Sequence, residues 1–333
     1  MVVITGGAGY IGSHMVRLVQ DSGYQAVVVD NLATGHASAV HSDAILRVGE
    51  IGNVALMTQI LREFSPGCVM HFAAASLIGE SVSNPGKYWQ ANLVQTLSLL
   101  DTMRLCGVGQ FIFSSSAAVY GNPREVPIIE SHPRLPINPY GQSKLAVENA
   151  LADYSQAYGL CSTTFRYFNA AGAHPDGSLG ECHEPETHLI PLILQVAAGQ
   201  RTEIGRFGND LDTPDGSCIR DYVHVQDIAA AHLLALKRLE AGGSSAIYNL
   251  GNGEGHSVTE VIDAAQRVTG QTISVRDDAR RVGDPPVLVA NAAHARSELG
   301  WQPRYPDIEN IIAHAWQWEM MKLQMPTRNM EKR

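Results

Sequence analysis

The chain has 333 residues, of which 45% are hydrophobic and 17% are charged, as is typical of a globular enzyme with a full core. Its formal net charge of −9 excludes a generally basic surface for nucleic acid. The length predicts one large domain or two closely coupled domains.

The first residues after Met1 form the apolar run VVIT, which predicts a buried strand and not a signal peptide. The run LIPLILQVAAG from Leu189 is too short to span a bilayer, so we expect a buried helix there and no membrane span. Five cysteines are scattered without the spacing of a zinc or redox site. We therefore expect reduced thiols in a cytoplasmic protein and no structural metal.

Short apolar runs alternate with helical patterns through the first half of the chain. Strands are predicted at 2–5, 26–30, 68–74, 111–116 and 162–168, and helices at 11–22, 54–64, 87–106 and 139–158. Because the strands are apolar almost throughout, the pattern predicts an α/β fold with a doubly wound parallel sheet covered by helices on both faces.

The pattern changes after Phe168, where AGAHPDGSLGECHEPETH is polar and long for a passive connection. The segments DYVHVQDIAAAHLLAL and IYNLGNG then predict a return to the sheet. We therefore expect a main domain formed by 1–173 and 218–250, and a smaller, discontinuous α/β domain formed by 174–217 and 251–333.

A glycine-rich segment, GGAGYIG, follows the first predicted strand and precedes an amphipathic helical pattern. It matches G-x-G-x-x-G from Gly7, and Gly6, Gly9 and Gly12 give a second match, G-x-x-G-x-x-G. Glycines permit a tight turn and let backbone N–H groups approach a pyrophosphate, which the helix N-terminus also attracts. The strand–turn–helix context predicts a dinucleotide-binding loop.

Asp30 ends the second predicted strand, 18 positions after Gly12. A carboxylate near this position accepts hydrogen bonds from the adenosine ribose hydroxyls. It would also repel a 2′-phosphate, so the sequence favours NAD over NADP.

The segment NPYGQSK places a tyrosine and a lysine four residues apart at the start of a predicted helix. Asn138 as the N-cap and Pro139 as the first helical residue would put Tyr140 and Lys144 on one face. Ser116 ends the predicted strand FIFSSS, at the sheet edge where ligands bind in parallel α/β folds.

These three side chains can couple proton transfer to hydride transfer. A tyrosine pKa near 10 is too high for a base at neutral pH. We expect Lys144 and the positive nicotinamide of NAD⁺ to lower the pKa of Tyr140. The phenolate would take a proton from a substrate hydroxyl while hydride leaves the same carbon, and Ser116 would hydrogen-bond the same oxygen.

A series of motifs occurs in this order: GGAGYIGSH, HFAA, GES, FSSSAAVYG, PYGQSK, RYFNAAGAHP, FGND, IRDYVHVQD, YNLGNG and RRVGDP. From Val2 to about Trp318 the chain resembles the UDP-galactose 4-epimerases of the extended short-chain dehydrogenase/reductase family. The glycine loop and the Ser–Tyr–Lys set are common to the superfamily, whereas RYFNAAGAHP, IRDYVHV and RRVGDP are typical of the epimerase branch.

The resemblance implies a Rossmann domain that keeps NAD bound and a smaller domain that binds a UDP-sugar. It implies inversion at C4 of a UDP-hexose, through transient oxidation to a 4-keto sugar that presents its other face before reduction. It also implies a homodimer formed through the helices near 87–106 and 139–158.

The resemblance carries over three sets of residues. The catalytic set is Ser116, Tyr140 and Lys144. The cofactor-binding set is Gly6, Gly9, Tyr10, Ile11, Gly12, Asp30, Asn31, Glu50, Ile51, Phe72, Ala73, Ala74, Asn92, Tyr140, Lys144 and Tyr167. The substrate-binding set is Ser116, Tyr140, Asn169, His188, Leu189, Gly205, Phe207, Arg220, Arg281, Asp284 and Leu288.

Within the substrate set, Arg220 and Arg281 are expected to pair with the pyrophosphate, because guanidinium groups match phosphate oxygens. Asp284 is expected to accept from ribose hydroxyls. Phe207 lies where the family packs uracil, and Leu189 can offer its backbone N–H.

The sequence departs from the common family pattern at several positions. Glu50 stands where aspartate is frequent, Ser76 where some members have lysine, and His188 where asparagine is common. Leu288 occupies a position that is often a large tyrosine or a small residue and that limits the space for a 2-N-acetyl group. Arg206, beside the expected uracil segment, has no assigned role.

Two alternative substrates stay open at this point, and two other functions are disfavoured. Epimerisation of UDP-N-acetylglucosamine depends on the space at Leu288, and nothing in the sequence excludes UDP-xylose. A 4,6-dehydratase is disfavoured because Ala117 and Ala118 beside Ser116 offer no acid or base. A non-catalytic NAD-binding sensor would not need Ser116, Tyr140 and Lys144 together.

Overall fold

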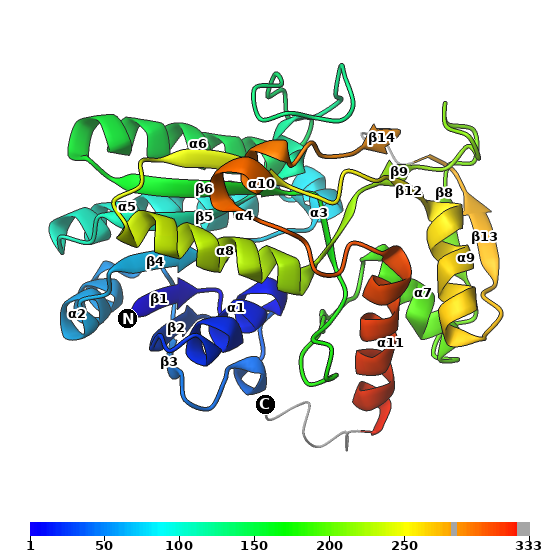
Figure 1. Ribbon diagram of the computed structural model, residues 1–333, viewed down its shortest axis with the longest axis horizontal. Coiled ribbons are helices and arrows are strands. Elements are labelled where there is room, and N and C mark those ends of the chain that lie inside the picture. Colours follow the sequence, from blue (N-terminus) through cyan, green and yellow to red (C-terminus); the bar gives the residue numbers. More distant parts are fainter. Residues whose placement is uncertain (281–284, 325–333) are drawn as a thin grey trace.

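The computed structural model describes residues 1–280 and 285–324 (Figure 1). Its centre is a seven-stranded sheet in the order β11-β6-β5-β4-β1-β2-β3, with every neighbouring pair parallel. The strands are β1 (Val2–Thr5), β2 (Ala26–Asp30), β3 (Ile45–Val48), β4 (Cys68–His71), β5 (Gln110–Ser116), β6 (Cys161–Tyr167) and β11 (Ala246–Leu250). The strand order reverses between β1 and β4, so the predicted doubly wound parallel sheet is confirmed.

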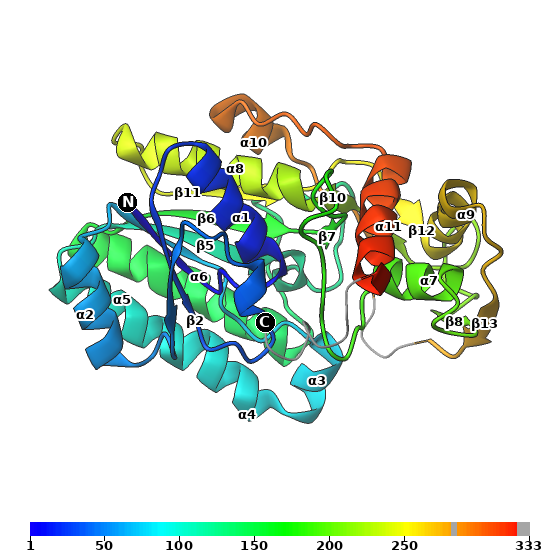
Figure 2. The same cartoon turned by 90° about the horizontal axis from the view of Figure 1, so that it is seen from below.

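Two layers of helices cover this sheet (Figures 1 and 2). On one face α1 (Tyr10–Asp21) packs against α8 (Val225–Glu240), and α10 (Ala293–Leu299) lies beside α8 and β11. On the other face lie α2 (Val54–Phe64), α5 (Gln95–Leu105) and α6 (Pro139–Tyr158). Each layer shares a separate apolar cluster with one face of the sheet, because strand side chains alternate between the two faces.

Two differences from the predicted elements have local causes. The strand β3 was not predicted, because its four residues ILRV lie at the sheet edge and are half-buried or exposed, which leaves only a weak apolar signal. The predicted helix 87–106 is divided into α4 (Pro85–Tyr88), a π-helical stretch (Trp89–Val94) and α5. Single π-helical turns often occur at functional sites.

A smaller group of elements packs beside the carboxyl ends of the sheet strands (Figure 1). Its apolar cluster joins α7 (Leu189–Ala197), α9 (Val258–Thr269) and α11 (Ile308–Gln324). The expected buried helix at Leu189 is therefore present as α7. Short strands complete the group as the pairs β8 (Ile204–Phe207) with β13 (Val275–Asp278) and β7 (Asn169–Ala171) with β10 (Tyr222–His224), and as the trio β12 (His256–Ser257), β9 (Ile219–Arg220) and β14 (Val287–Leu288).

The remaining regular elements are α3 (Ile78–Ser83) and the 3₁₀ turns η1 (Ala37–Ala39) and η3 (Ala117–Val119). Across residues 1–280 and 285–324, none of the helices combines the length and the apolar character needed to cross a membrane.

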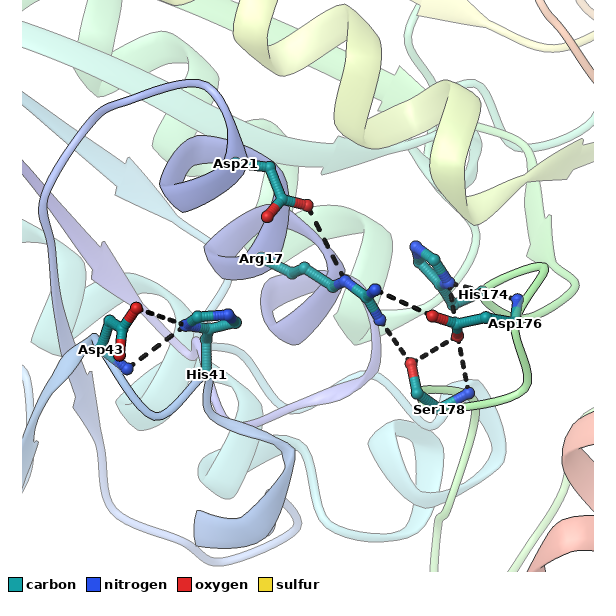
Figure 3. Close-up of polar contacts among 7 residues, drawn as sticks. All are labelled: Arg17, Asp21, His41, Asp43, His174, Asp176 and Ser178. Carbon is teal, nitrogen blue, oxygen red and sulfur yellow. Dashed lines mark hydrogen bonds and ion pairs between the residues drawn. The ribbon is translucent and has the colours of Figure 1, made fainter.

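The connection that leaves β7 is fixed to α1 by an ionic cluster (Figure 3). The Arg17 guanidinium lies 2.8 Å from an Asp176 carboxylate oxygen and also donates to the Ser178 hydroxyl. Asp176 in turn accepts from the Ser178 backbone N–H at 2.9 Å, and its carboxylate lies 2.6 Å from His174 Nδ1. These contacts set the path by which the chain reaches residues 181–188.

Candidate active site

A cavity of about 750 Å³ lies at the carboxyl ends of the central strands. Its wall includes the glycine loop after β1, the ends of β2, β4, β5 and β6, the first turns of α6, and residues from the segment 181–188. The sheet order reverses at this edge, and α/β sheets bind ligands where it does so.

The glycine loop follows β1 and opens helix α1. At Gly6 the backbone has φ of +73°, and an added Cβ would lie 2.4 Å from the Ala73 backbone nitrogen. At Gly12 an added Cβ would lie 2.1 Å from the Gly6 carbonyl oxygen. The protein's own packing therefore requires glycine at both positions.

Gly9 differs from these two glycines. Its φ is −83°, and an added Cβ would meet only the Gly6 carbonyl oxygen, at an ordinary 3.4 Å. Gly9 lines the cavity and is the N-cap of α1, which has neither a side-chain cap nor an acidic residue in its first turn. Because glycine has no side chain and the N-terminus of α1 has no nearby acidic residue of its own first turn, a pyrophosphate could approach the backbone closely here.

Asp30 lies at the end of β2 and on the cavity wall. One carboxylate oxygen accepts from the Ala8 backbone N–H at 3.0 Å, and the other accepts from the Leu32 N–H at 2.8 Å. Asp30 therefore holds the glycine loop in place, a role that the sequence pattern did not indicate. Each oxygen keeps a further lone pair for a ribose hydroxyl.

All other members of the predicted cofactor set line the same cavity except Asn92. Asn92 is buried in the π-helical stretch, where its amide accepts from the Ala75 N–H at 2.8 Å and donates to the Ala75 carbonyl and the Ser143 hydroxyl, each at 3.0 Å. It thus joins the segment after β4 to α6 and positions the cavity wall without being part of it.

The start of α6 has the geometry that the sequence predicted. Asn138 is the N-cap, its side-chain oxygen accepts from the Gly141 N–H at 2.8 Å, and Pro139 is the first helical residue. Tyr140 and Lys144 consequently share one helix face and line the cavity together with Ser116 from the end of β5. The Ser116 hydroxyl hydrogen-bonds the Tyr140 phenol.

In the protein alone, Lys144 does not produce the expected fall in the pKa of Tyr140, and the expected effect of NAD⁺ stays a prediction. Burial raises the pKa of Tyr140 above 10.0, and the hydrogen bond with Ser116 opposes that rise only in part. Lys144 does not reverse the effect, because its ammonium is itself buried and donates to the Ser114 carbonyl at 2.8 Å, with Nζ 5.9 Å from the Tyr140 ring centroid. Burial lowers the pKa of Lys144 to about 7, although Glu148 acts in the opposite direction.

A buried ion pair behind the cavity was not anticipated from the sequence. Arg166 of β6 donates from Nε and Nη2 to the two carboxylate oxygens of Glu148 on α6, at 3.0 and 2.7 Å. Glu148 also accepts from the Ser115 hydroxyl at 2.5 Å, and Arg166 donates to the Tyr120 hydroxyl at 2.8 Å. The network fixes α6 against β5 and β6. The only feature of the sequence that indicates this network is Arg166, an arginine within an otherwise largely apolar predicted strand.

The predicted substrate residues divide into three groups. Asn169, His188, Arg220 and Leu288 line the cavity. Leu189, Gly205 and Phe207 are not among the described residues of its wall: Leu189 begins α7, and the other two lie in β8. Arg281 and Asp284 lie outside the described residues.

Arg206, which had no assigned role, joins three elements of the smaller group. Its guanidinium lies 2.7 Å from the Asp277 carboxylate on the paired strand β13 and donates to the Thr259 hydroxyl of α9 at 3.0 Å. Arg206 is therefore a structural residue, which explains a charge beside the expected uracil segment.

Comparisons with known proteins agree with this geometry. Residues 2–251 match the model of the NAD dependent epimerase/dehydratase family. The chain is 49% identical over 317 residues to a UDP-glucose 4-epimerase from Halalkalibacterium halodurans, covering 95% of each chain. It is 50% identical over 320 residues to a UDP-glucose 4-epimerase from Streptococcus mutans, covering 95% of this chain and 96% of the relative.

A solved structure is also similar over nearly the whole chain. The UDP-glucose 4-epimerase from Brucella ovis in complex with NAD superposes with a TM-score of 0.92 at 47% identity, covering 95% of this chain and 98% of that one. The predicted resemblance is thus confirmed by sequence and by fold. This chain belongs to the NAD dependent epimerase/dehydratase family.

Proposed function

We propose that this chain inverts the configuration at C4 of a UDP-hexose, interconverting UDP-glucose and UDP-galactose with NAD kept bound. The observation that carries the proposal is the convergence of Ser116, Tyr140 and Lys144 with the glycine loop and Asp30 on one cavity. A family match alone would allow a sensor, whereas this convergence supports a proton acceptor beside a dinucleotide-binding site.

The residues present fit NAD. Gly9 and the N-terminus of α1 would receive the pyrophosphate, Asp30 would accept from the adenosine ribose hydroxyls, and Tyr167 would lie at the inner wall. When bound, NAD⁺ supplies a hydride acceptor, returns the hydride later, and adds positive charge to the cavity. That charge matters because burial alone disfavours the Tyr140 phenolate.

The chain's own residues manage the proton and the orientation of the sugar. Tyr140 takes the proton of the C4 hydroxyl and returns it when the 4-keto sugar is reduced from its other face. Ser116 hydrogen-bonds the same oxygen and stabilises the forming carbonyl. Lys144, anchored on the Ser114 carbonyl, holds its cationic end near the Tyr140 ring.

Inversion requires a firm hold on the nucleotide and a loose hold on the sugar. Asn169, His188 and Arg220 supply polar groups on the part of the wall contributed by the smaller group of elements. We assign them, with Leu189, Phe207, Arg281 and Asp284, to UDP. We also propose a division into an NAD-binding part (1–173 and 218–250) and a UDP-sugar-binding part (174–217 and 251–333); three short strands of the smaller group, β7, β9 and β10, belong in sequence to the first part.

The proposal is tested by assaying UDP-galactose, UDP-N-acetylgalactosamine and UDP-xylose side by side. We expect interconversion of UDP-galactose and UDP-glucose, with no net consumption of NAD. Leu288 lines the cavity, so turnover of the N-acetylated sugar would show that its side chain leaves room for a 2-N-acetyl group. Release of NAD on heating without conversion of any of the three sugars would favour a non-catalytic NAD-binding protein and defeat the proposal.

Replacing Gly9 by Ala should weaken NAD binding while leaving the fold intact. The new methyl group meets no close protein atom but enters the space where we place the pyrophosphate. Overpacking of about 1–3 kcal/mol would lower NAD affinity by roughly fivefold to 150-fold. The measurement is NAD bound per chain after gel filtration, together with the melting temperature.

Gly109 offers a matched control, because an added Cβ there meets no atom within 4 Å. Gly109→Ala should leave NAD content unchanged. Equal NAD content in Gly9→Ala and in the control would show that the pyrophosphate does not approach Gly9.

We also propose that the protein is a cytoplasmic homodimer that pairs through α5 and α6. These helices contact each other and expose apolar side chains, including Leu105 and Tyr158, on the outer surface. The described cysteines are all free thiols, which suits a reducing compartment. A monomeric mass in solution would contradict the dimer.

A further inference from the structure

Four side chains of the segment 181–188 bring metal-ligating atoms together at the edge of the cavity. They are Glu181, His183, Glu186 and His188, in the spacing E-x-H-x-x-E-x-H. Each offers one ligand atom, and the four atoms lie within 4.8 Å of one another. Glu181, His183 and His188 also line the cavity.

Within this cluster, single atoms make more than one short contact. His188 Nδ1 lies 2.6 Å from Glu181 Oε1 and 2.9 Å from Glu186 Oε1, and His183 Nδ1 lies 3.0 Å from the same Glu181 oxygen. One N–H points in one direction and cannot serve two carboxylate oxygens well at once. A cation among the four atoms would satisfy all of them and separate the two carboxylates.

The spacing is close to that of a metal site. Metal–ligand bonds of about 2.0–2.2 Å separate tetrahedral ligand atoms by about 3.3–3.5 Å. Widening the closest contact from 2.6 Å, and closing atoms that lie up to 4.8 Å apart, would take relative movements of up to about 1.5 Å to arrange the four atoms around an ion. Imidazole nitrogens mixed with carboxylates favour Zn²⁺ and similar transition metals over Mg²⁺ or Ca²⁺, which prefer oxygen ligands only.

The backbone that carries these ligands is held from several sides. The Trp318 indole donates to the Glu181 carbonyl at 2.8 Å, and His36 Nε2 lies 2.8 Å from the Cys182 carbonyl. The Glu186 carboxylate accepts from the Thr187 and His188 N–H groups, at 2.7 and 2.9 Å. Upstream, the ionic cluster around Arg17 fixes the same connection (Figure 3). Such support pre-organises ligands for an ion.

We propose that Glu181, His183, Glu186 and His188 bind one divalent transition-metal ion, with Zn²⁺ as the best match. Metal binding does not depend on the proposed epimerase activity: His188 would offer the ion its Nδ1, the atom that lies in the cluster, and would use Nε2 in the UDP role assigned above. The ion would lie at the wall of the cavity that Arg220 also lines, and would add positive charge to that wall.

The test uses the full chain without an affinity tag, stripped of metal by a chelator and then dialysed against Zn²⁺ or Co²⁺. We expect about one Zn²⁺ per chain with a Kd of about 1 µM or below, a rise in melting temperature with Zn²⁺, and the visible absorption of Co²⁺ in a low-symmetry nitrogen and oxygen site. Metal content by mass spectrometry and the Co²⁺ spectrum are read without any activity assay.

The variant His183→Gln with Glu186→Gln removes two ligands and should weaken Zn²⁺ binding at least about tenfold. His294→Gln with Glu298→Gln removes an exposed histidine–glutamate pair, 3.2 Å apart on α10, and should leave Zn²⁺ binding unchanged. The single variant His183→Gln serves if the double variant does not fold.

Two results would overturn the proposal. The first is wild-type protein that retains no stoichiometric Zn²⁺ and shows no Co²⁺ absorption. The second is an equal loss of Zn²⁺ affinity in the cluster variant and in the α10 control. That result would mean that Zn²⁺ binds non-specifically to histidines on the surface.

Discussion

Replacing Tyr140 by Phe is expected to lower the rate of sugar interconversion by at least about 100-fold, the usual effect of losing a general acid–base group. The variant keeps the half-buried ring of α6 in its edge contact with Tyr88 but removes the hydroxyl that hydrogen-bonds Ser116. The steady-state conversion of UDP-galactose to UDP-glucose measures this loss. NAD released on heating should be unchanged, because the ring still lines the cavity.

Tyr158→Phe is the matched control. Tyr158 is the last residue of the same helix and is 57% exposed, and phenylalanine keeps the ring that we place at the proposed dimer surface, so loss of the hydroxyl should affect neither turnover nor folding. Turnover near the wild-type value in Tyr140→Phe would remove Tyr140 from the mechanism. The cavity would then need another proton acceptor.

Replacing Arg166 by Met should destabilise the protein by about 3–5 kcal/mol, because it leaves the Glu148 carboxylate buried without its partner. Both side chains are 1% exposed, and the two groups meet through two parallel hydrogen bonds. Arg134 lies 3.5 Å from Glu148, but its side chain is 39% exposed, so it would compensate only in part. Urea unfolding gives the change in unfolding free energy.

The double variant Arg166→Met with Glu148→Gln separates the lost charge pair from lost packing. The neutral amide leaves no buried charge and still accepts from the Ser115 hydroxyl, so much of the lost stability should return. A loss below about 1 kcal/mol in Arg166→Met would show that the carboxylate is protonated or hydrated in place. A double variant as unstable as the single one would assign the loss to packing.

Local patterns in the sequence predicted the features that depend on neighbouring residues. The run VVIT and the glycines after it determine a strand, a turn and a helix, because periodicity and backbone freedom act over a few residues. The N-cap at Asn138 likewise depends on residues three positions apart, and it places Tyr140 and Lys144 together. The resemblance to known epimerases added the assignment of C4 chemistry.

Other features depend on residues far apart in the chain. No cysteine spacing typical of a zinc site points to the cluster around Glu181, which forms because α1, α11 and the Arg17 contacts hold one polar connection in place. The edge strand β3 likewise becomes recognisable only through its pairing with β2.

The sequence by itself determined most of the strand and helix order in the first half of the chain, the glycine turn after β1 and the shared helix face of Tyr140 and Lys144. Only the tertiary structure decided the charge state that these groups prefer. The pKa of Tyr140 rises, and that of Lys144 falls to about 7, because several elements together exclude water from both side chains. The loss of water around a side chain depends on all the elements that surround it, so it cannot be read from the spacing of residues along the chain.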